Sequence, residues 1–222
     1  MPPNDVAELA APTSVVHKPL PHDSARLHVQ GSAAYVDDIR EPDGTLHVAI
    51  GMADRACGVL TSLDLSEVRA APGVVAVLTA ADIPGKNDIA PVFADEPLLA
   101  DTEVMFHGQS VFAVVARNRD QARRAARLAK IDIDEQPPSV TVADALKTGA
   151  RVQDDYAFAR GDAKAAIDAA AHRLEGQFSI GGQEHFYLEG QASLAIPGEG
   201  DEMTVHASSQ DPTETQHIVA RV

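Results

Sequence analysis

The sequence predicts an α+β fold in consecutive domains, and three observations support this prediction. Short apolar runs with strand-like alternation recur along the chain, Ala-rich stretches have helical spacing, and a break at Pro137 and Pro138 separates two such series. The length of 222 residues suits one large domain or one domain with part of another. We expect a flexible tail over residues 1–22, a first domain over 23–135, a linker over 136–150, and the N-terminal part of a second domain over 151–222.

The first sheet is expected to begin with a hairpin. Residues 31–39 are predicted to form a strand, the EPDG sequence at 41–44 a turn, and residues 45–53 the returning strand. Leu46, Val48 and Ile50 alternate along that second strand and therefore share one face.

Residues 62–85 are predicted to form a strand, a helix and a second strand. Ser66 or Asp64 can cap a short helix, and the Pro72-Gly73 pair ends it. The β-branched residues Val74, Val75 and Val77 then favour a strand that ends in a turn at 83–85.

The first domain is expected to close with a loop, two strands, a helix and a last strand. Residues 86–100 are rich in Asp and Pro and are predicted to form a long surface loop. Two strand-like runs flank His107-Gly108-Gln109 within residues 103–116. The stretch 118–130 predicts a helix with an alanine face, and the strand after it ends at the Pro-Pro break.

The second domain is predicted to start with an Ala-rich helix capped by Asp162. Three strands are expected at 173–180, 190–197 and 202–209, followed by a helix with Pro212 in its first turn. Because that helix reaches Val222 without a capping signal, we expect the chain to be a fragment whose second domain is incomplete.

Composition and charge exclude several classes of function. The formal net charge is −15, so a nucleic-acid-binding or anionic-membrane role is disfavoured. Cys57 is the single cysteine, which excludes an internal disulfide or a cysteine-held cluster on this chain and favours the reducing cytoplasm. Neither a dinucleotide-binding glycine motif nor a P-loop is present, and no apolar stretch has the length of a membrane helix.

The strongest candidate for a functional site is the string GGQEHFYLEGQ at 181–191, together with HASSQDP at 206–212. Gln210 follows a predicted strand and precedes a predicted helix, a position from which side chains often reach ligands. The set Glu184, His185 and Glu189 lacks the second histidine of a zinc-protease motif, so we predict no metal ligand among these residues. The pattern alone fits a polar turn between strands or the wall of a pocket.

The two strings, with DSARLHVQGSAAYVDDI at 23–39 and PGVVAVLTAADIP at 72–84, resemble the molybdenum-binding large subunits of the molybdenum hydroxylase family of xanthine dehydrogenases and aldehyde oxidases. The resemblance runs from about residue 17 to the C-terminus. It implies that residues 23–135 form an α/β-hammerhead domain and that the remainder begins a molybdopterin-binding domain.

The resemblance also implies roles for particular residues. Gln210 matches the family glutamine that lies beside the molybdenum centre and hydrogen-bonds its apical oxygen ligand without binding the metal. Gln183, Glu184, His185 and Phe186 match a family motif near the active site, which implies a structural or cofactor-binding role for them. The glycine-rich segment, the substrate-orienting Glu and Arg, and the Glu base of the family have no counterpart here, so we expect this chain alone to be inactive.

The implied activity is the hydroxylation of a purine such as hypoxanthine or xanthine at molybdenum–molybdopterin, with oxygen taken from water. Electrons would pass through 2Fe-2S clusters and FAD on a partner chain or region to NAD, in a homo-oligomeric assembly of heterodimers. The alternatives are an aldehyde oxidase or another aromatic hydroxylase of the same family, and a non-catalytic assembly domain that docks another subunit through the loop 86–100.

Overall fold

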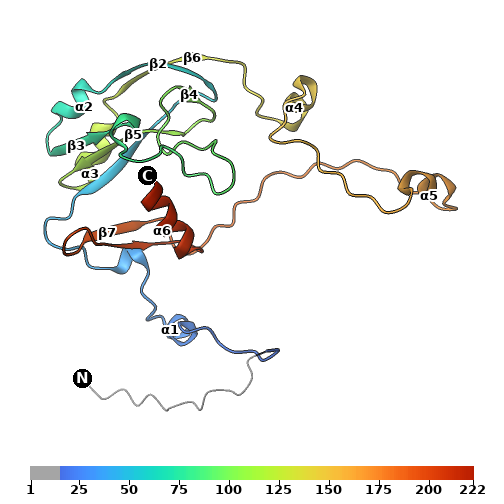
Figure 1. Cartoon of the computed structure of the whole chain (residues 1–222), viewed down its shortest axis with the longest axis horizontal. Coiled ribbons are helices and arrows are strands. Elements are labelled where there is room, and N and C mark those ends of the chain that lie inside the picture. Colours follow the sequence, from blue (N-terminus) through green and yellow to red (C-terminus); the bar gives the residue numbers. More distant parts are fainter. Residues whose placement is uncertain (1–15) are drawn as a thin grey trace. The chain divides into compact units, whose positions relative to one another are not determined.

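The computed structural model describes residues 16–222 and confirms the α+β class (Figure 1). Residues 1–15 of the predicted tail lie outside the described part of the chain, and residues 16–22 are exposed. The chain divides into two compact units, one comprising the residues up to Arg40 with Tyr187–Ser208, the other Glu41–Phe186 with Ser209–Val222.

Two three-stranded antiparallel sheets form the centre of the larger unit. The first has the order β1-β5-β3, and the second has the order β4-β2-β6. Helices α2 and α3 join and cover these strands, and η2 is a short 3-10 helix. The bounds of these elements are β1 His47–Met52, β2 Gly58–Asp64, α2 Ser66–Ala70, β3 Val74–Leu78, η2 Ala80–Asp82, β4 Glu103–Val104, β5 Ser110–Ala116, α3 Arg119–Ala126 and β6 Lys130–Glu135.

The hydrophobic core is built from residues of both sheets and of helices α2 and α3. Phe112 and Val114 of β5 are fully buried, and Ala122 and Ala125 of α3 pack closely because they carry only a methyl group. Asn118 caps α3, since its side chain accepts a hydrogen bond from the Gln121 N–H at 2.8 Å. The alanine face predicted for this helix is therefore confirmed.

Strand β1 is confirmed, and its alternation is correct, but its apolar face points outward. Val48 and Ile50 are 59% and 42% exposed, whereas Ala49 and Gly51 lie on the inner side. A Cβ at Gly51 would lie 2.0 Å from the Phe112 ring, so the ring occupies the inner side and only a glycine fits opposite it. The size of the residue facing Phe112 decides which face is buried.

The predicted strand at residues 31–39 is wrong. The segment is preceded by helix α1 (Ala25–Gln30), which ends at Gly31 in the left-handed conformation, and it contains the 3-10 helix η1 (Val36–Asp38). The Asp38 carboxylate accepts a hydrogen bond from the Tyr35 N–H at 3.0 Å. A local side-chain bond therefore satisfies a backbone donor that a strand would have offered to a neighbour.

The loop predicted at residues 86–100 is confirmed and is closed at its base. The Asn87 side chain accepts a hydrogen bond from the Leu99 N–H at 3.0 Å and donates one to the Leu99 carbonyl at 2.7 Å. Arg221 donates to the Ala90 carbonyl at 2.8 Å, which holds the end of helix α6 (Pro212–Arg221) on the loop. Val92 and Phe93 remain exposed at its tip.

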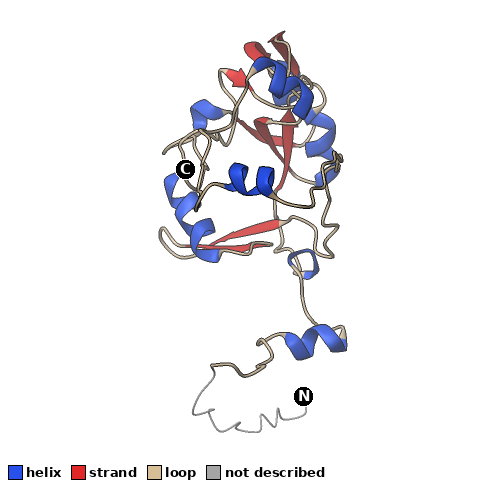
Figure 2. Ribbon diagram, turned by 90° about the vertical axis from the view of Figure 1, so that its right-hand side faces the viewer, coloured by secondary structure: helices blue, strands red, loops and turns tan. Residues whose placement is uncertain are grey.

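The part of the chain after β6 has regular elements but no buried residue. The predicted linker 136–150 contains helix α4 (Val142–Thr148), and α5 (Ala163–Ala169) is capped by Asp162 as predicted. Strands β7 (Ser193–Pro197) and β8 (Met203–Ala207) form the hairpin drawn in Figure 2. Residues 173–180 form no strand, because no neighbouring strand pairs with them in the described chain.

Candidate functional site

Gln210 lies between β8 and α6, inside a hydrogen-bonded turn. The Asp211 N–H donates to Ser209 Oγ at 3.1 Å, and Ser209 Oγ lies 3.2 Å from the Asp211 carbonyl oxygen. The Asp211 carboxylate accepts from the Glu214 N–H at 2.9 Å and caps α6, which starts with Pro212. The turn forms here because Ser and Asp side chains satisfy N–H groups that the start of a helix leaves unpaired.

A threonine one helical turn further on completes this arrangement. Thr215 Oγ1 lies 3.0 Å from Ser209 Oγ and 3.0 Å from the Asp211 carbonyl oxygen. Thr215 is half-buried, whereas the Gln210 side chain is exposed and has no hydrogen-bond partner among the described residues. The Gln210 amide is thus carried on a fixed turn and is free to donate a hydrogen bond to a group outside this chain.

The other four predicted site residues lie in an extended segment without regular secondary structure. Gln183, Glu184, His185 and Phe186 are all exposed, and the Phe186 N–H donates to Glu184 Oε1 at 3.4 Å. Phe186 has a φ of 51°, a left-handed conformation that few residues with a side chain adopt. Within residues 16–222 no hydrogen bond joins these four residues to Gln210, so their cofactor-binding role stays a prediction.

In the smaller unit, hydrogen bonds join two pairs of residues that the sequence did not indicate as partners. Glu189 Oε1 accepts a hydrogen bond from the Val36 N–H at 3.2 Å, which joins the end of the GGQEHFYLE string to η1. The Ser208 hydroxyl accepts from the Ala192 N–H at 3.0 Å, and the Ser208 N–H donates to the Ala192 carbonyl at 3.1 Å. The two bonds between Ser208 and Ala192 extend the β7–β8 ladder up to the residue before Ser209.

Sequence reasoning identified Gln210 but missed Ser209 and Thr215. The available signal was the spacing itself, because Ser209, Asp211 and Pro212 in succession are typical of a capped helix start. Thr215 carried no signal of its own, since a threonine in the first helical turn is common on solvated faces.

The described residues contain no group of three or more His, Cys, Asp or Glu side chains placed to hold a metal ion. The donor set around Gln210 consists of an amide and hydroxyl groups, which suit hydrogen bonding to the ligands of a bound cofactor. These residues therefore fit a metal centre that is bound through an organic ligand, with the protein contacting that ligand.

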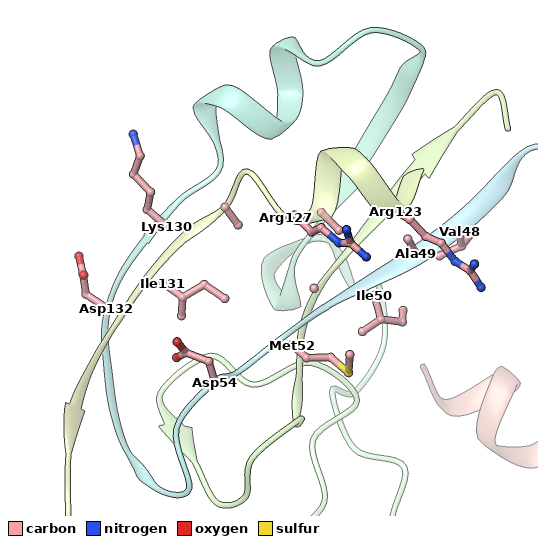
Figure 3. A pocket seen from close by; sticks show the side chains of 13 residues that line it. Val48, Ala49, Ile50, Met52, Asp54, Arg123, Arg127, Lys130, Ile131 and Asp132 are labelled. Atoms are coloured by element: carbon pink, nitrogen blue, oxygen red, sulfur yellow. The ribbon is translucent and has the colours of Figure 1, made fainter. Parts of the chain in front are cut away.

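A groove of about 870 Å³ lies elsewhere in the larger unit, along β1, the end of α3 and the start of β6 (Figure 3). Its lining includes Val48, Ile50 and Met52 of β1, together with Arg123 and Arg127. None of the predicted site residues lines it. The alternation of apolar residues in β1 gave the signal for this surface, because it places Val48 and Ile50 on one face of the strand.

The titratable groups with clearly shifted pKa values lie outside both predicted site strings. The pKa of Asp64 is lowered mainly by the hydrogen bond from the Ser66 N–H, and that of Asp82 mainly by the bond from the Thr79 N–H. The pKa of Lys130 is raised by its hydrogen bond and ion pair with Glu67 at 2.7 Å. All three shifts result from local contacts of exposed surface groups.

Two family models match consecutive parts of the chain. The model described as "Aldehyde oxidase and xanthine dehydrogenase, a/b hammerhead domain" matches residues 30–137. The model described as "Molybdopterin cofactor-binding domain" matches residues 147–222, which include Gln210 and all four residues of the extended segment. Among the described residues, no helix combines the length and apolarity needed to cross a membrane.

Curated relatives cover most of this chain at moderate identity. A xanthine dehydrogenase of Dictyostelium discoideum is 38% identical over 207 residues, which are 93% of this chain and 15% of the relative. Aldehyde oxidase 3 of Rattus norvegicus is 39% identical over 206 residues, or 92% of this chain and 15% of the relative. The chain thus spans about 15% of the length of these relatives.

Solved structures match the fold. Quinoline 2-oxidoreductase from Pseudomonas putida 86 superposes with a TM-score of 0.75 at 26% identity, covering 89% of this chain and 27% of that one. Aldehyde oxidoreductase from Desulfovibrio gigas superposes with a TM-score of 0.71 at 27% identity, covering 85% of this chain and 23% of that one.

Proposed function

Because the chain belongs to the molybdenum hydroxylase family of xanthine dehydrogenases and aldehyde oxidases, we propose that it forms part of a purine hydroxylase. The proposed reaction converts hypoxanthine or xanthine to urate with water as the source of oxygen and NAD as the final electron acceptor. The hammerhead domain is proposed to span residues 23–135, with a linker at 136–150 and the start of the cofactor domain at 151–222.

The observation that carries this proposal is the Gln210 side chain within the region that matches a molybdopterin cofactor-binding domain. Its amide is exposed, its turn is fixed by Ser209 and Asp211, and no described residue accepts its N–H groups. When bound, the molybdenum–molybdopterin group supplies two-electron redox chemistry and activates the oxygen that is transferred. Gln210 is proposed to hydrogen-bond an oxygen ligand of that group and to leave the metal itself uncoordinated.

The remaining residues of the cofactor region have supporting roles in this proposal. Gln183, Glu184, His185 and Phe186 are exposed and make one hydrogen bond among themselves, so their side chains are available to a cofactor or to further polypeptide. We assign them to contacts around the cofactor. The reaction also requires residues that orient the substrate and take up its proton, and these are proposed to come from the rest of the cofactor domain.

The partners follow from the chemistry. Two-electron oxidation at molybdenum needs an exit for electrons, and Cys57 alone cannot hold an iron–sulfur cluster. We therefore propose that 2Fe-2S and FAD components on a partner chain or region accept the electrons, in a homo-oligomeric assembly of heterodimers. A cytoplasmic location is proposed because the single cysteine suits a reducing compartment.

A second candidate substrate class is supported by the comparisons. The aldehyde oxidase relative is as similar to this chain as the xanthine dehydrogenase relative, and a quinoline oxidoreductase shares the fold. An aldehyde or a nitrogen heterocycle is therefore the alternative substrate. The substrate is decided by groups outside the described turn, because Gln210 contacts the cofactor in either case.

The test is steady-state turnover of the assembled holoenzyme with xanthine, an aliphatic aldehyde and quinoline, in the wild type and in Gln210→Ala. We expect xanthine turnover with NAD, a loss of about 10- to 100-fold in Gln210→Ala, and unchanged molybdenum content. Gln216→Ala is the matched control, since Gln216 is an exposed glutamine of α6, the helix that follows Gln210.

Three other results would change this proposal. Turnover of aldehyde or quinoline without xanthine would keep the family and replace the substrate. Gln210→Ala with wild-type turnover would remove Gln210 from the site. Absence of molybdenum from a folded, assembled protein would leave the non-catalytic assembly role, in which the exposed tip of loop 86–100 docks another subunit.

A further inference from the structure

We propose that Thr215 is a positioning residue that acts on the cofactor through Gln210, with the Ser209 hydroxyl as the link. This inference deepens the proposed function and rests on it. It concerns two hydroxyl groups for which neither the family resemblance nor the comparisons supply a role.

Gln210 lies within a turn that is closed by a hydrogen bond to the Ser209 side chain. The Ser209 hydroxyl accepts the Asp211 N–H at 3.1 Å, so the hydrogen bond spans Gln210 and restrains its backbone dihedral angles. The direction in which the amide leaves the chain therefore depends on the rotamer of Ser209.

Thr215 restrains the rotamer of Ser209. Thr215 Oγ1 lies 3.0 Å from Ser209 Oγ and 3.0 Å from the Asp211 carbonyl, while the Thr215 N–H donates to the same carbonyl at 3.1 Å. A β-branched side chain on a helix has few rotamers, so its hydroxyl is held in place at little entropic cost. Helix α6 thus anchors the turn through Thr215, which lies one helical turn after Asp211.

The hydroxyl groups of Ser209 and Thr215 differ from the Gln210 amide in their hydrogen-bond partners. Ser209 and Thr215 satisfy each other, whereas the Gln210 amide has no partner in the described chain. A hydrogen bond from the Gln210 amide to a ligand is stronger when the backbone already holds the amide in the required direction. A small misplacement of the amide weakens this bond because its strength depends on geometry.

The experiment compares Thr215→Val with Thr215→Ser in the holoenzyme, each alone and in the Gln210→Ala background. Valine keeps the branched shape and loses the hydroxyl, and serine keeps the hydroxyl. Thr213→Val is the matched control, because Thr213 is exposed in the first turn of α6 and no hydrogen bond of its side chain is described. The measurements are kcat and KM, molybdenum content, and the electron paramagnetic resonance spectrum of the reduced enzyme.

We expect Thr215→Val to lower kcat about two- to ten-fold, the effect of one hydrogen bond, with KM and molybdenum content unchanged. Thr215→Ser restores kcat, and Thr213→Val behaves as the wild type. The spectrum of Thr215→Val shifts in the direction seen for Gln210→Ala. In the Gln210→Ala background the further loss from Thr215→Val disappears, because two groups that act through one contact are not additive.

The inference is overturned if Thr215→Val has the same kcat as Thr213→Val. It is also overturned if the loss of kcat in Thr215→Val persists unchanged in the Gln210→Ala background, because the role of Thr215 would then be purely structural. Either outcome leaves the proposed function intact as long as Gln210→Ala remains impaired. A fully active Gln210→Ala enzyme overturns both the role of Gln210 and the inference that depends on it.

Discussion

The two regions of the molecule differ in where their apolar side chains lie. Every buried residue of the described chain falls between Gly51 and Ala125, and residues 136–222 contain none. Phe112 is fully buried in the first region, whereas Phe186 is 92% exposed in the second. The first region therefore carries its own core, while the cofactor-matching region leaves its apolar side chains available to groups beyond the described chain.

This difference predicts its largest effect for paired phenylalanine substitutions. Phe112→Ala removes a fully buried ring from the core and is expected to lower the free energy of unfolding by about 3–5 kcal/mol. Phe186→Ala in the same 222-residue chain is expected to change it by less than about 0.5 kcal/mol, since the ring contacts mainly water. Urea unfolding measures the free energy of unfolding of both variants. Equal losses of this free energy would show that the second region has a core of its own.

A smaller loss is expected when a methyl group is added to a glycine. Gly51→Ala places a Cβ within 2.0 Å of the Phe112 ring, so the ring must move and the free energy of unfolding falls by about 1–3 kcal/mol. Gly182→Ala is the matched change in the cofactor-matching region, where no atom lies within 4 Å of the added group. A neutral Gly51→Ala in urea unfolding would mean that β1 does not pack on Phe112 as described.

Helix caps give a third contrast of about 1 kcal/mol. Asn118→Ala removes the cap of α3, whose alanines are buried, and is expected to lower the unfolding free energy by about that amount. Asp162→Ala removes the cap of α5, which has no buried residue, so α5 frays without changing the global transition. Far-ultraviolet circular dichroism and urea unfolding together measure both effects, and a shared global loss would contradict the contrast.

The smallest expected effect is a dependence of stability on pH that arises at Asp82, in the first region. The pKa of Asp82 lies below its usual value of 3.8 because the Thr79 N–H and hydroxyl donate to its carboxylate. A lowered folded-state pKa gives stability that is present above the unfolded-state pKa and is lost as the pH falls through the folded-state value.

We therefore expect Asp82→Asn to flatten the acid limb of the stability profile between about pH 5 and pH 2. Asp201→Asn, in the turn between β7 and β8, is the control. Urea midpoints at successive pH values provide the measurement. An acid limb that is unchanged in Asp82→Asn and reduced in Asp201→Asn would contradict this assignment.

Sequence reasoning succeeded where local chemistry decides the structure. The alanine spacing placed α3, and Pro212 after Asp211 placed the start of α6. Gln210 was located at the end of a strand and before a helix, and the structure has β8 and α6 at these positions.

The remaining features depended on contacts that a sequence does not display. The inner face of β1 needs a glycine at position 51 because the Phe112 ring of β5 lies opposite it, and the strand predicted at 173–180 lacks a pairing partner in the described chain. The Ser209–Thr215 contact requires the helical turn that brings the two hydroxyls together. Alternation predicts that a strand has two faces, but tertiary packing chooses between them.

We propose that this chain carries part of a molybdenum site in which Gln210 contacts the cofactor without holding it. The most direct test is molybdenum and pterin analysis of the purified, assembled protein beside its Gln210→Ala variant, with xanthine turnover measured on the same samples. We expect the same molybdenum and pterin content in both proteins and reduced turnover in the variant alone. A wild-type protein that is folded and assembled but free of molybdenum and pterin, or a variant that has lost both, would contradict it.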